Sequence, residues 1–315
     1  MLYLGIDQHA RQLTISLRDE DGDVLQARQV STEPDKIQAF FQHLTRERLS
    51  SDESFVAVVE VCGFNDWLIR MLRDYRCHKV ILIQPEERKK RKTDRRDAAA
   101  LSELLWVNRH RLLAGKPVRG LRQVDISSTT DQENRRLTTL RKDASRARTR
   151  LINKIKHILR RHNLQWEMPT KTFPTQPAIA WLQKLVLPEV DQLEMNHLLI
   201  DLEQAQQRMC ELEEKLAQRC GTSEAATLLS SMPGVGHFTA TALACRVGRV
   251  ERFARSRSLA NYWGLTPGCR NSGENNQRLG SSIARVAVMR KLATIIWHML
   301  TKRTTYAKCR ALATD

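Results

Sequence analysis

The chain of 315 residues has a globular composition, with 41% hydrophobic and 28% charged residues, and it is strongly basic, with a formal net charge of +17. Its length allows two or three domains. No apolar run approaches the ~18 residues of a membrane span, and the N-terminus shows no secretory signal. The seven cysteines are odd in number and include no C-x-x-C pair, which argues against a disulfide framework and a zinc site. We therefore expect a cytoplasmic protein with reduced thiols and no membrane partner.

The positive charge is concentrated in two segments. Residues 84–165 carry a net charge of +14 and residues 222–315 carry +10, whereas residues 1–83 and 166–221 are weakly acidic. Two basic segments separated by an acidic one indicate two faces that bind a polyanion. Nucleic acid is the simplest such partner.

The first 85 residues predict strands that alternate with helices. Runs of β-branched and apolar residues indicate the strands, and helical spacing of apolar residues indicates the helices. The expected elements are strands at Leu2–Asp7, Leu13–Leu17 and Val24–Val30, a helix from Pro34, a strand at Phe55–Val59, a helix through Trp67 and Leu72, and a strand at Val80–Ile83.

Two acidic residues stand at the ends of predicted strands. Asp7 ends the run from Leu2, and Glu60 directly follows Phe55–Val59. With a helix expected after residue 92, the order βββαβαβα matches the ribonuclease-H-like architecture, in which acids at strand ends bind a metal. For either motif alone, an acid that caps the following turn is the alternative.

Asp94 and Asp97 form a second acidic pair. The alanine- and leucine-rich residues that follow favour a helix, so the two aspartates share one helix face. Together with Asp7 and Glu60 they would offer the oxygen ligands that Mg²⁺ prefers. As an alternative, the pair only caps the helix, because acids suit its N-terminal end. Nearby bases would place phosphates beside the carboxylates: Arg88, Lys89, Lys90, Arg91, Lys92, Arg95 and Arg96.

Two long helices are predicted in the middle of the chain. A basic helix from about Asp125 to His162 has apolar residues at 3–4 spacing, and an acidic helix further on has a second such seam. The seams pair either with each other or across a dimer, and the sequence leaves both open. Arg141 and Arg148 on the basic helix are candidates for nucleic-acid binding. The seam residues are Leu137, Leu140, Ala144, Ala147, Leu151 and Ile158, then Leu198, Leu202, Ala205, Met209, Leu212 and Leu216.

Two motifs follow in the C-terminal segment. A Pro-Gly-Val-Gly turn between two short helices is the helix-hairpin-helix pattern, and its Gly234 and Gly236 would let the backbone approach a phosphate. A purely structural hairpin is the alternative. Ser272, in a loop with Arg270, is either an ordinary turn residue or a nucleophile. Arg270 is a further candidate for nucleic-acid binding.

The chain resembles the DEDD transposases of bacterial insertion sequences, the insertion-sequence one-ten family, which includes the Piv DNA invertases. The resemblance covers nearly the whole chain. It implies an α/β, ribonuclease-H-like (RuvC-like) domain over residues 1–110, a helical coiled-coil region over 111–222 and a helical transposase domain over 223–315. The motifs that carry it are Gly5-Ile6-Asp7, Val59-Glu60-Val61-Cys62-Gly63, Lys92-Thr93-Asp94-Arg95-Arg96-Asp97-Ala98, Pro233-Gly234-Val235-Gly236, Gly264-Leu265-Thr266-Pro267 and Ser272-Gly273.

The resemblance also implies a mechanism. The four acids would bind Mg²⁺, and Ser272 would become covalently linked to a DNA phosphate. The implied partners are double-stranded donor and target DNA, a non-coding bridge RNA, and further copies of the chain in a dimer or tetramer. Where the family has a lysine-glycine pair before its last helix, this chain has Ser281-Ser282, which are alternative nucleophiles.

Two other functions fit the same residues. One is a RuvC-like, structure-selective endonuclease that uses the four acids with water as the nucleophile. The other is a non-catalytic nucleic-acid-binding protein in which the acids only cap turns and helices. The acidic quartet favours an enzyme, and trapping a covalent protein–DNA adduct would separate a recombinase from a nuclease.

Overall fold

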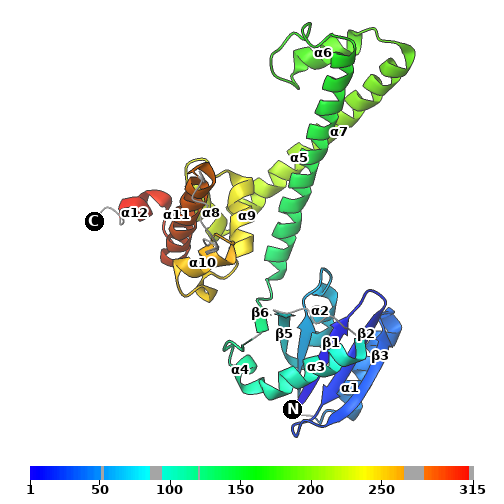
Figure 1. Cartoon of the computed structure of the whole chain (residues 1–315), viewed down its shortest axis with the longest axis vertical. Coiled ribbons are helices and arrows are strands. Elements are labelled where there is room, and N and C mark those ends of the chain that lie inside the picture. Colours follow the sequence, from blue (N-terminus) through cyan, green and yellow to red (C-terminus); the bar gives the residue numbers. More distant parts are fainter. Residues whose placement is uncertain (51–52, 86–93, 120, 266–279, 312–315) are drawn as a thin grey trace, which may run out of the picture. The chain divides into compact units, whose positions relative to one another are not determined.

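A computed structural model of the chain describes residues 1–50, 53–85, 94–119, 121–265 and 280–311. The chain divides into two compact units, Met1–Ile126 and Ser127–Asp315. The first unit combines a sheet with helices, and the described part of the second unit is helical (Figure 1). A mixed α/β N-terminal region followed by a helical part is therefore confirmed.

A six-stranded mixed sheet forms the centre of the first unit, with the strand order β3-β2-β1-β4-β5-β6 (Figure 1). The central strands β1, β4 and β5 are parallel, whereas β2, β3 and β6 pair with their neighbours in antiparallel fashion. The five strands predicted from the sequence are confirmed, with small shifts at their ends. The bounds are β1 (Leu2–Gln8), β2 (Gln12–Arg18), β3 (Val24–Ser31), β4 (Phe55–Glu60), β5 (Cys77–Pro85) and β6 (Leu121–Val124).

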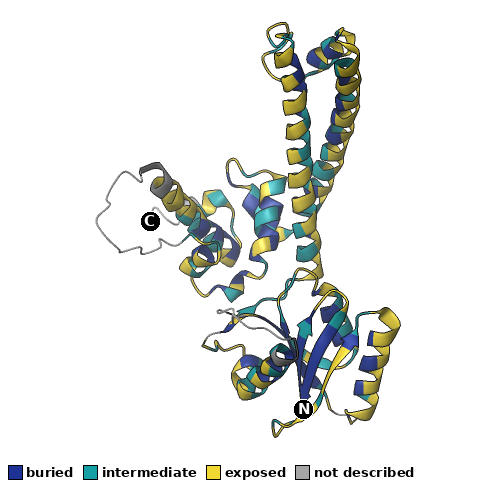
Figure 2. Ribbon diagram, turned by 45° about the vertical axis from the view of Figure 1, so that its right-hand side comes forward, coloured by how far each residue is buried: buried dark blue, intermediate teal, exposed yellow. Residues whose placement is uncertain are grey.

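Helices cover both faces of the sheet, so its central strands are buried on both sides. On one face, α1 (Pro34–Glu47) and α2 (Asp66–Asp74) pack on a core that includes Leu4 and Ile6. On the other face, α3 (Asp94–Val107) and α4 (Arg109–Leu113) pack on a core that includes Tyr3 and Val58. Such two-sided burial explains the nearly continuous apolar strands (Figure 2).

The first unit continues past residue 110 because β6 pairs with β5. β6 was not predicted. It is four residues long and only Leu121 in it is fully buried, so its sequence carries little of the strand pattern.

The second unit is built on two long helices with shorter ones packed around them (Figure 1). α5 begins at Thr129, where the Ser128 side chain accepts a hydrogen bond from the Asp131 backbone amide and so caps the helix. The bounds are α5 (Thr129–Arg161), α6 (Gln176–Lys184), α7 (Glu189–Gly221), α8 (Glu224–Ser230), α9 (His237–Val247), a 3-10 turn η1 (Val250–Arg252), α10 (Ser256–Tyr262), α11 (Gly280–Lys302) and α12 (Tyr306–Ala311).

α5 and α7 form an antiparallel pair within one chain. Glu133, near the start of α5, accepts a hydrogen bond of 2.8 Å from Arg219, near the end of α7. At the opposite ends of the two helices, Arg161 forms an ion pair with Asp191. The acidic and basic helices therefore pair with each other within one chain.

The predicted seam is present on α7 and, apart from one residue, on α5. Leu198, Leu202, Ala205 and Leu216 of α7 are buried, and Met209 and Leu212 are half-buried. On α5, Ile158 is buried and Leu137, Ala144, Ala147 and Leu151 are half-buried. Leu140 is 58% exposed, and the prediction that it faces a partner helix is wrong. The other buried positions of α5 are Asn134, Thr138, Ile152, Ile155 and Leu159. The first two of these are polar, so a search for apolar spacing did not find them.

Two sequence-based exclusions can be compared with the described residues. Within them, no helix has the length and apolar character needed to cross a bilayer. The six cysteines in the described ranges are free thiols. Burial raises the pKa of the Cys77 thiol to about 12, so this side chain stays protonated and unreactive at neutral pH.

Candidate active site

Asp7 and Glu60 occupy adjacent positions at the ends of parallel strands. Ile6 pairs with Val59 in the ladder between β1 and β4, so the two acids take the next position on each strand. Side chains alternate between the faces of a sheet. Val58 packs in the core beneath α3, so Glu60, two residues later, projects toward the same face. The same argument, starting from Tyr3, places Asp7 on that face.

The direction of α3 brings its first turn to the same end of β1. Its last turn lies at the other end, where the Trp106 indole donates a hydrogen bond of 2.9 Å to the Glu20 carbonyl beside the β2–β3 turn. Ser102 lies over the middle of the sheet, with its Oγ 2.8 Å from the Ser16 Oγ of β2. The start of α3 therefore lies above the end of β1 that carries Asp7.

The helix approaches β1 so closely that only glycine fits at position 5. A Cβ on Gly5 would lie 2.4 Å from the Ser102 backbone nitrogen and 2.5 Å from the Ala98 carbonyl oxygen. Both atoms belong to the α3 backbone and cannot rotate away. Gly5 thus sets the distance between α3 and the strand that carries Asp7.

Asp94 and Asp97 lie in the first turn of α3. Asp97 is half-buried. The backbone of Asp94 begins the helix, one turn before Ala98, but its side chain lies outside the described residues. Among the described side chains, no three His, Cys, Asp or Glu residues are arranged to hold a metal ion. The backbone thus brings the four predicted acids to one corner of the unit, and their joint binding of a metal stays a prediction.

A buried amide network holds the ends of β1 and β4 together. The Asn65 Nδ2 donates hydrogen bonds to the Gln8 Oε1 at 2.8 Å and to the Glu60 carbonyl at 3.2 Å. The Asn65 Oδ1 accepts a bond of 2.6 Å from the Cys62 amide, and the Gln8 Nε2 donates to the Phe64 carbonyl. Sequence reasoning missed this pair of side chains because Gln8 ends a strand, Asn65 precedes a helix, and two isolated amides give no periodic signal.

Two further polar side chains adjoin Asp7. The His9 Nε2 lies 3.2 Å from the Asp7 Oδ2. The hydroxyl of Thr14, directly opposite Asp7 on β2, is buried and has no hydrogen-bond partner among the described groups. A buried hydroxyl next to carboxylates is compatible with a polar ligand at this corner, since buried polar atoms normally have a partner.

Many of the predicted site residues lie outside the described residues. Residues 86–93 and 266–279 are not described, and of Arg95, Arg96, Ser281 and Ser282 only the helical backbone is described. The predicted residues that fall in the two gaps are Arg88, Lys89, Lys90, Arg91, Lys92, Arg270 and Ser272.

Arg141 contacts α7 and α9, Arg148 is half-buried on α5, and their role in binding nucleic acid stays a prediction. The Arg141 guanidinium contacts the Glu213 carboxylate at 2.6 Å and lies 4.6 Å from the centroid of the Phe238 ring. Arg148 is half-buried, one turn before the buried Ile152. The exposed bases of α5 form an outer basic face instead: Arg136, Lys142, Arg146, Arg150, Lys154 and Arg160.

The Pro233–Gly236 turn joins α8 and α9, which pack in the core of the second unit. Gly234 has a φ of 80°, a conformation that favours glycine. Gly236 is the N-terminal cap of α9. No described heavy atom lies within 4 Å of the position that a Cβ would occupy on either glycine. The turn is therefore accessible from solvent on that side, as backbone contact with a phosphate requires.

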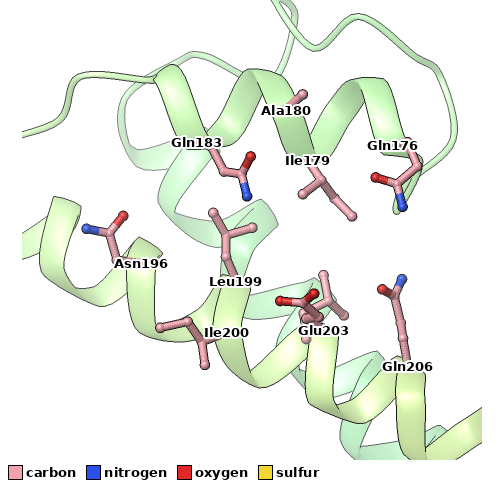
Figure 3. Close-up of a pocket in the computed structure, with 10 residues that line it drawn as sticks. Gln176, Ile179, Ala180, Gln183, Asn196, Leu199, Ile200, Glu203 and Gln206 are labelled. Atoms are coloured by element: carbon pink, nitrogen blue, oxygen red, sulfur yellow. The ribbon is translucent and has the colours of Figure 1, made fainter.

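A groove of about 390 Å³ lies between α6 and α7 of the second unit (Figure 3). Its lining combines amides such as Gln176, Gln183 and Asn196 with the aliphatic Ile179 and Leu199. Glu203 is its sole titratable lining residue. The groove offers no cluster of carboxylates, so the acidic corner of the first unit is the better candidate for catalysis.

Comparison with known proteins identifies the class of protein. Residues 4–164 match the family model of the IS110 DEDD transposases, described as "Transposase", and residues 226–310 match the "Transposase IS116/IS110/IS902 family". A "Transposase for insertion sequence element IS1111A" of Coxiella burnetii is 29% identical over 205 residues, 65% of this chain and 53% of that protein. A "Probable family 20 transposase" of Pseudomonas aeruginosa is 25% identical over 232 residues, 72% of this chain and 65% of that protein.

Both matched family models describe transposases. The first family model covers half of the chain, and the chain belongs to the IS110 family of DEDD transposases. The matched regions span about half to two-thirds of the length of the two relatives.

Proposed function

We propose that this protein is a DNA recombinase that moves an insertion sequence by cutting and rejoining DNA strands. The observation that carries this proposal is the corner where β1, β4 and the first turn of α3 meet, with Asp7, Glu60, Asp94 and Asp97 on its three elements. The strand order supports a ribonuclease-H-like fold for the first unit. The helical-hairpin turn and the outer basic face of α5 support DNA contact.

The four acids fit a divalent metal ion, on which membership of the DEDD family implies dependence. Carboxylate oxygens are hard ligands, and two strands plus one helix deliver them from fixed backbone positions. We propose Mg²⁺ as the ion. When bound, it would offset charge on a DNA phosphate and favour the ionised form of a nearby hydroxyl. Gly5 and the Asn65–Gln8 network would keep the ligand-bearing elements in register.

Ser272 is the proposed nucleophile. Its hydroxyl loses a proton to water, the Oγ–P bond forms, and the P–O bond to the sugar breaks as that sugar oxygen takes up a proton. The phosphodiester bond is exchanged rather than hydrolysed, so another strand can be joined without a nucleotide cofactor. Ser281 and Ser282 remain the alternative positions for this role.

The proposed partners are donor and target double-stranded DNA, a bridge RNA that pairs with both, and other copies of the chain. Phosphate contacts would fix the position of the nucleic acid, whereas base pairing to the RNA would supply sequence selectivity. The predicted acids and Ser272 belong to different units of the chain. We propose that the acids of one protomer act with the serine of another in a dimer or tetramer.

A complementation experiment tests the shared site. Ser272→Ala and Asp7→Asn proteins are each inactive in recombination, and mixing them with DNA and guide RNA restores part of the activity. The control is a mixture of Ser272→Ala with Ser272→Ala/Asp7→Asn, which has no intact serine. No recovery in mixed oligomers that are shown to form would place the whole site within one chain. Recombination by Ser272→Ala alone would remove Ser272 from the mechanism.

A RuvC-like endonuclease is the second candidate, and the described acids favour it as much as they favour a recombinase. Water would replace the serine as the nucleophile, so no protein–DNA bond would form. Denaturing gels of the protein with radiolabelled DNA separate the two. A labelled protein band that is lost in Ser272→Ala supports the recombinase, and cut DNA without such a band supports the endonuclease.

A further inference from the structure

Thr14 is a buried polar residue without a hydrogen-bond partner among the described residues. It lies on β2 and is 1% exposed, and its Oγ1 makes no hydrogen bond to any described group. A valine would fill the same space and suits a strand equally well. Buried hydroxyls are nearly always hydrogen-bonded in folded proteins, so this hydroxyl indicates a partner beyond the described side chains.

The position of this hydroxyl is defined by its neighbours. Thr14 pairs with Asp7 across the antiparallel ladder of β1 and β2, and directly opposed residues project from the same face. Two residues along β2, the Ser16 Oγ bonds to Ser102 of α3. Thr14 therefore also faces α3, beside Asp7 and beneath the turn that carries Asp97.

A threonine hydroxyl at this place can donate one hydrogen bond to a carboxylate oxygen or to a water molecule. Its β-branched side chain has few accessible rotamers, so the donor is held in a defined direction. Residues that orient metal ligands in this way strongly affect metal affinity although they do not touch the ion.

We propose that Thr14 is a positioning residue of the acidic corner, whose hydroxyl donates to the oxygen shell of a bound divalent cation. This inference rests on the proposed metal site. It extends that site beyond the four acids to a strand on the far side of β1. Thr14 would act through the ligands and not on the DNA itself.

The test compares Thr14→Val with the wild-type protein in two measurements without DNA. Removal of an orphaned hydroxyl should leave the Tm of the metal-free protein in EDTA unchanged or higher. In contrast, Mn²⁺ and Mg²⁺ binding, measured by titration calorimetry, should weaken about tenfold, the lower end of outer-shell effects. Thr14→Ser, which retains the hydroxyl, should restore most of the affinity, and Asp7→Asn should abolish binding.

The outcomes separate this inference from the proposed function. Equal metal affinity in wild-type and Thr14→Val proteins would overturn the role of Thr14 and leave the acidic site intact. A lower Tm of Thr14→Val in EDTA, with proportionate losses in Thr14→Ser, would show a packing role and also overturn it. Absence of metal binding by the wild-type protein would overturn the proposed metal site and this inference together.

Discussion

Gly5 is a residue at which the α3 backbone lies against the sheet. Replacing it with alanine should destabilise the first unit by roughly 1–3 kcal/mol, because the new Cβ would overlap two backbone atoms of α3 and force the helix outward. Urea denaturation measures this change. The matched control is Gly63→Ala, since Gly63 has no described heavy atom within 4 Å of its Cβ position.

The Gly63→Ala change should alter stability by no more than about 0.5 kcal/mol. Equal effects of the two substitutions would mean that α3 does not approach β1 as described. The same displacement should weaken divalent-cation binding in Gly5→Ala, because Asp97 lies one residue before the Ala98 contact.

At the scale of single elements, Arg141 ties α5 to both α7 and α9. Its pair with Glu213 is partly screened, since the two side chains are 27% and 42% exposed. With the contact over Phe238, we expect Arg141→Ala to destabilise the second unit by about 1 kcal/mol. The control is Arg146→Ala, whose side chain is 65% exposed.

The two arginine variants should have opposite effects on stability and on DNA affinity. Arg146→Ala should retain stability and lose DNA affinity, whereas Arg141→Ala should lose stability and retain affinity once folded. Chemical denaturation and fluorescence anisotropy with a DNA duplex give the two readouts. A loss of affinity confined to Arg141→Ala would reverse our assignment of the outer basic face.

The sequence predicts helices and strands well where their buried side chains are apolar, and poorly where those side chains are polar. Five strands of the sheet follow from β-branched runs, and Leu198 to Leu216 mark the buried stripe of α7. On α5 the predicted stripe includes the buried Ile158, but it misses the buried Asn134 and Thr138 because they are polar. The meeting of Asp7 and Glu60 follows from two parallel strand ends, but the Asn65–Gln8 pair depends on loop geometry that no periodicity encodes.

At the scale of the whole molecule, two basic segments should make nucleic-acid binding strongly dependent on salt. Each neutralised phosphate releases counterions, so log K should fall linearly with log salt, and each lost contact should reduce the slope by about 0.9. Replacing Arg146, Arg150 and Lys154 by alanine should therefore flatten the slope by roughly 2–3. Arg208→Ala, on the acidic α7, serves as the control and should leave it unchanged. Affinity insensitive to salt would contradict a role for the basic segments.

The antiparallel path of α5 and α7 has a consequence for how this protein can diversify. The start of α5 lies beside α9, where Arg135 donates a hydrogen bond to the Cys245 carbonyl. The end of α7 returns to the same place, since Arg219 contacts Glu133 directly. Removing seven residues from α5 and the seven opposite them on α7 would shorten the helix pair by about 10 Å. The start of α5 and the end of α7 would stay where they are. The length of the α5–α7 helix pair can thus change by paired insertions or deletions while the rest of the unit keeps its packing.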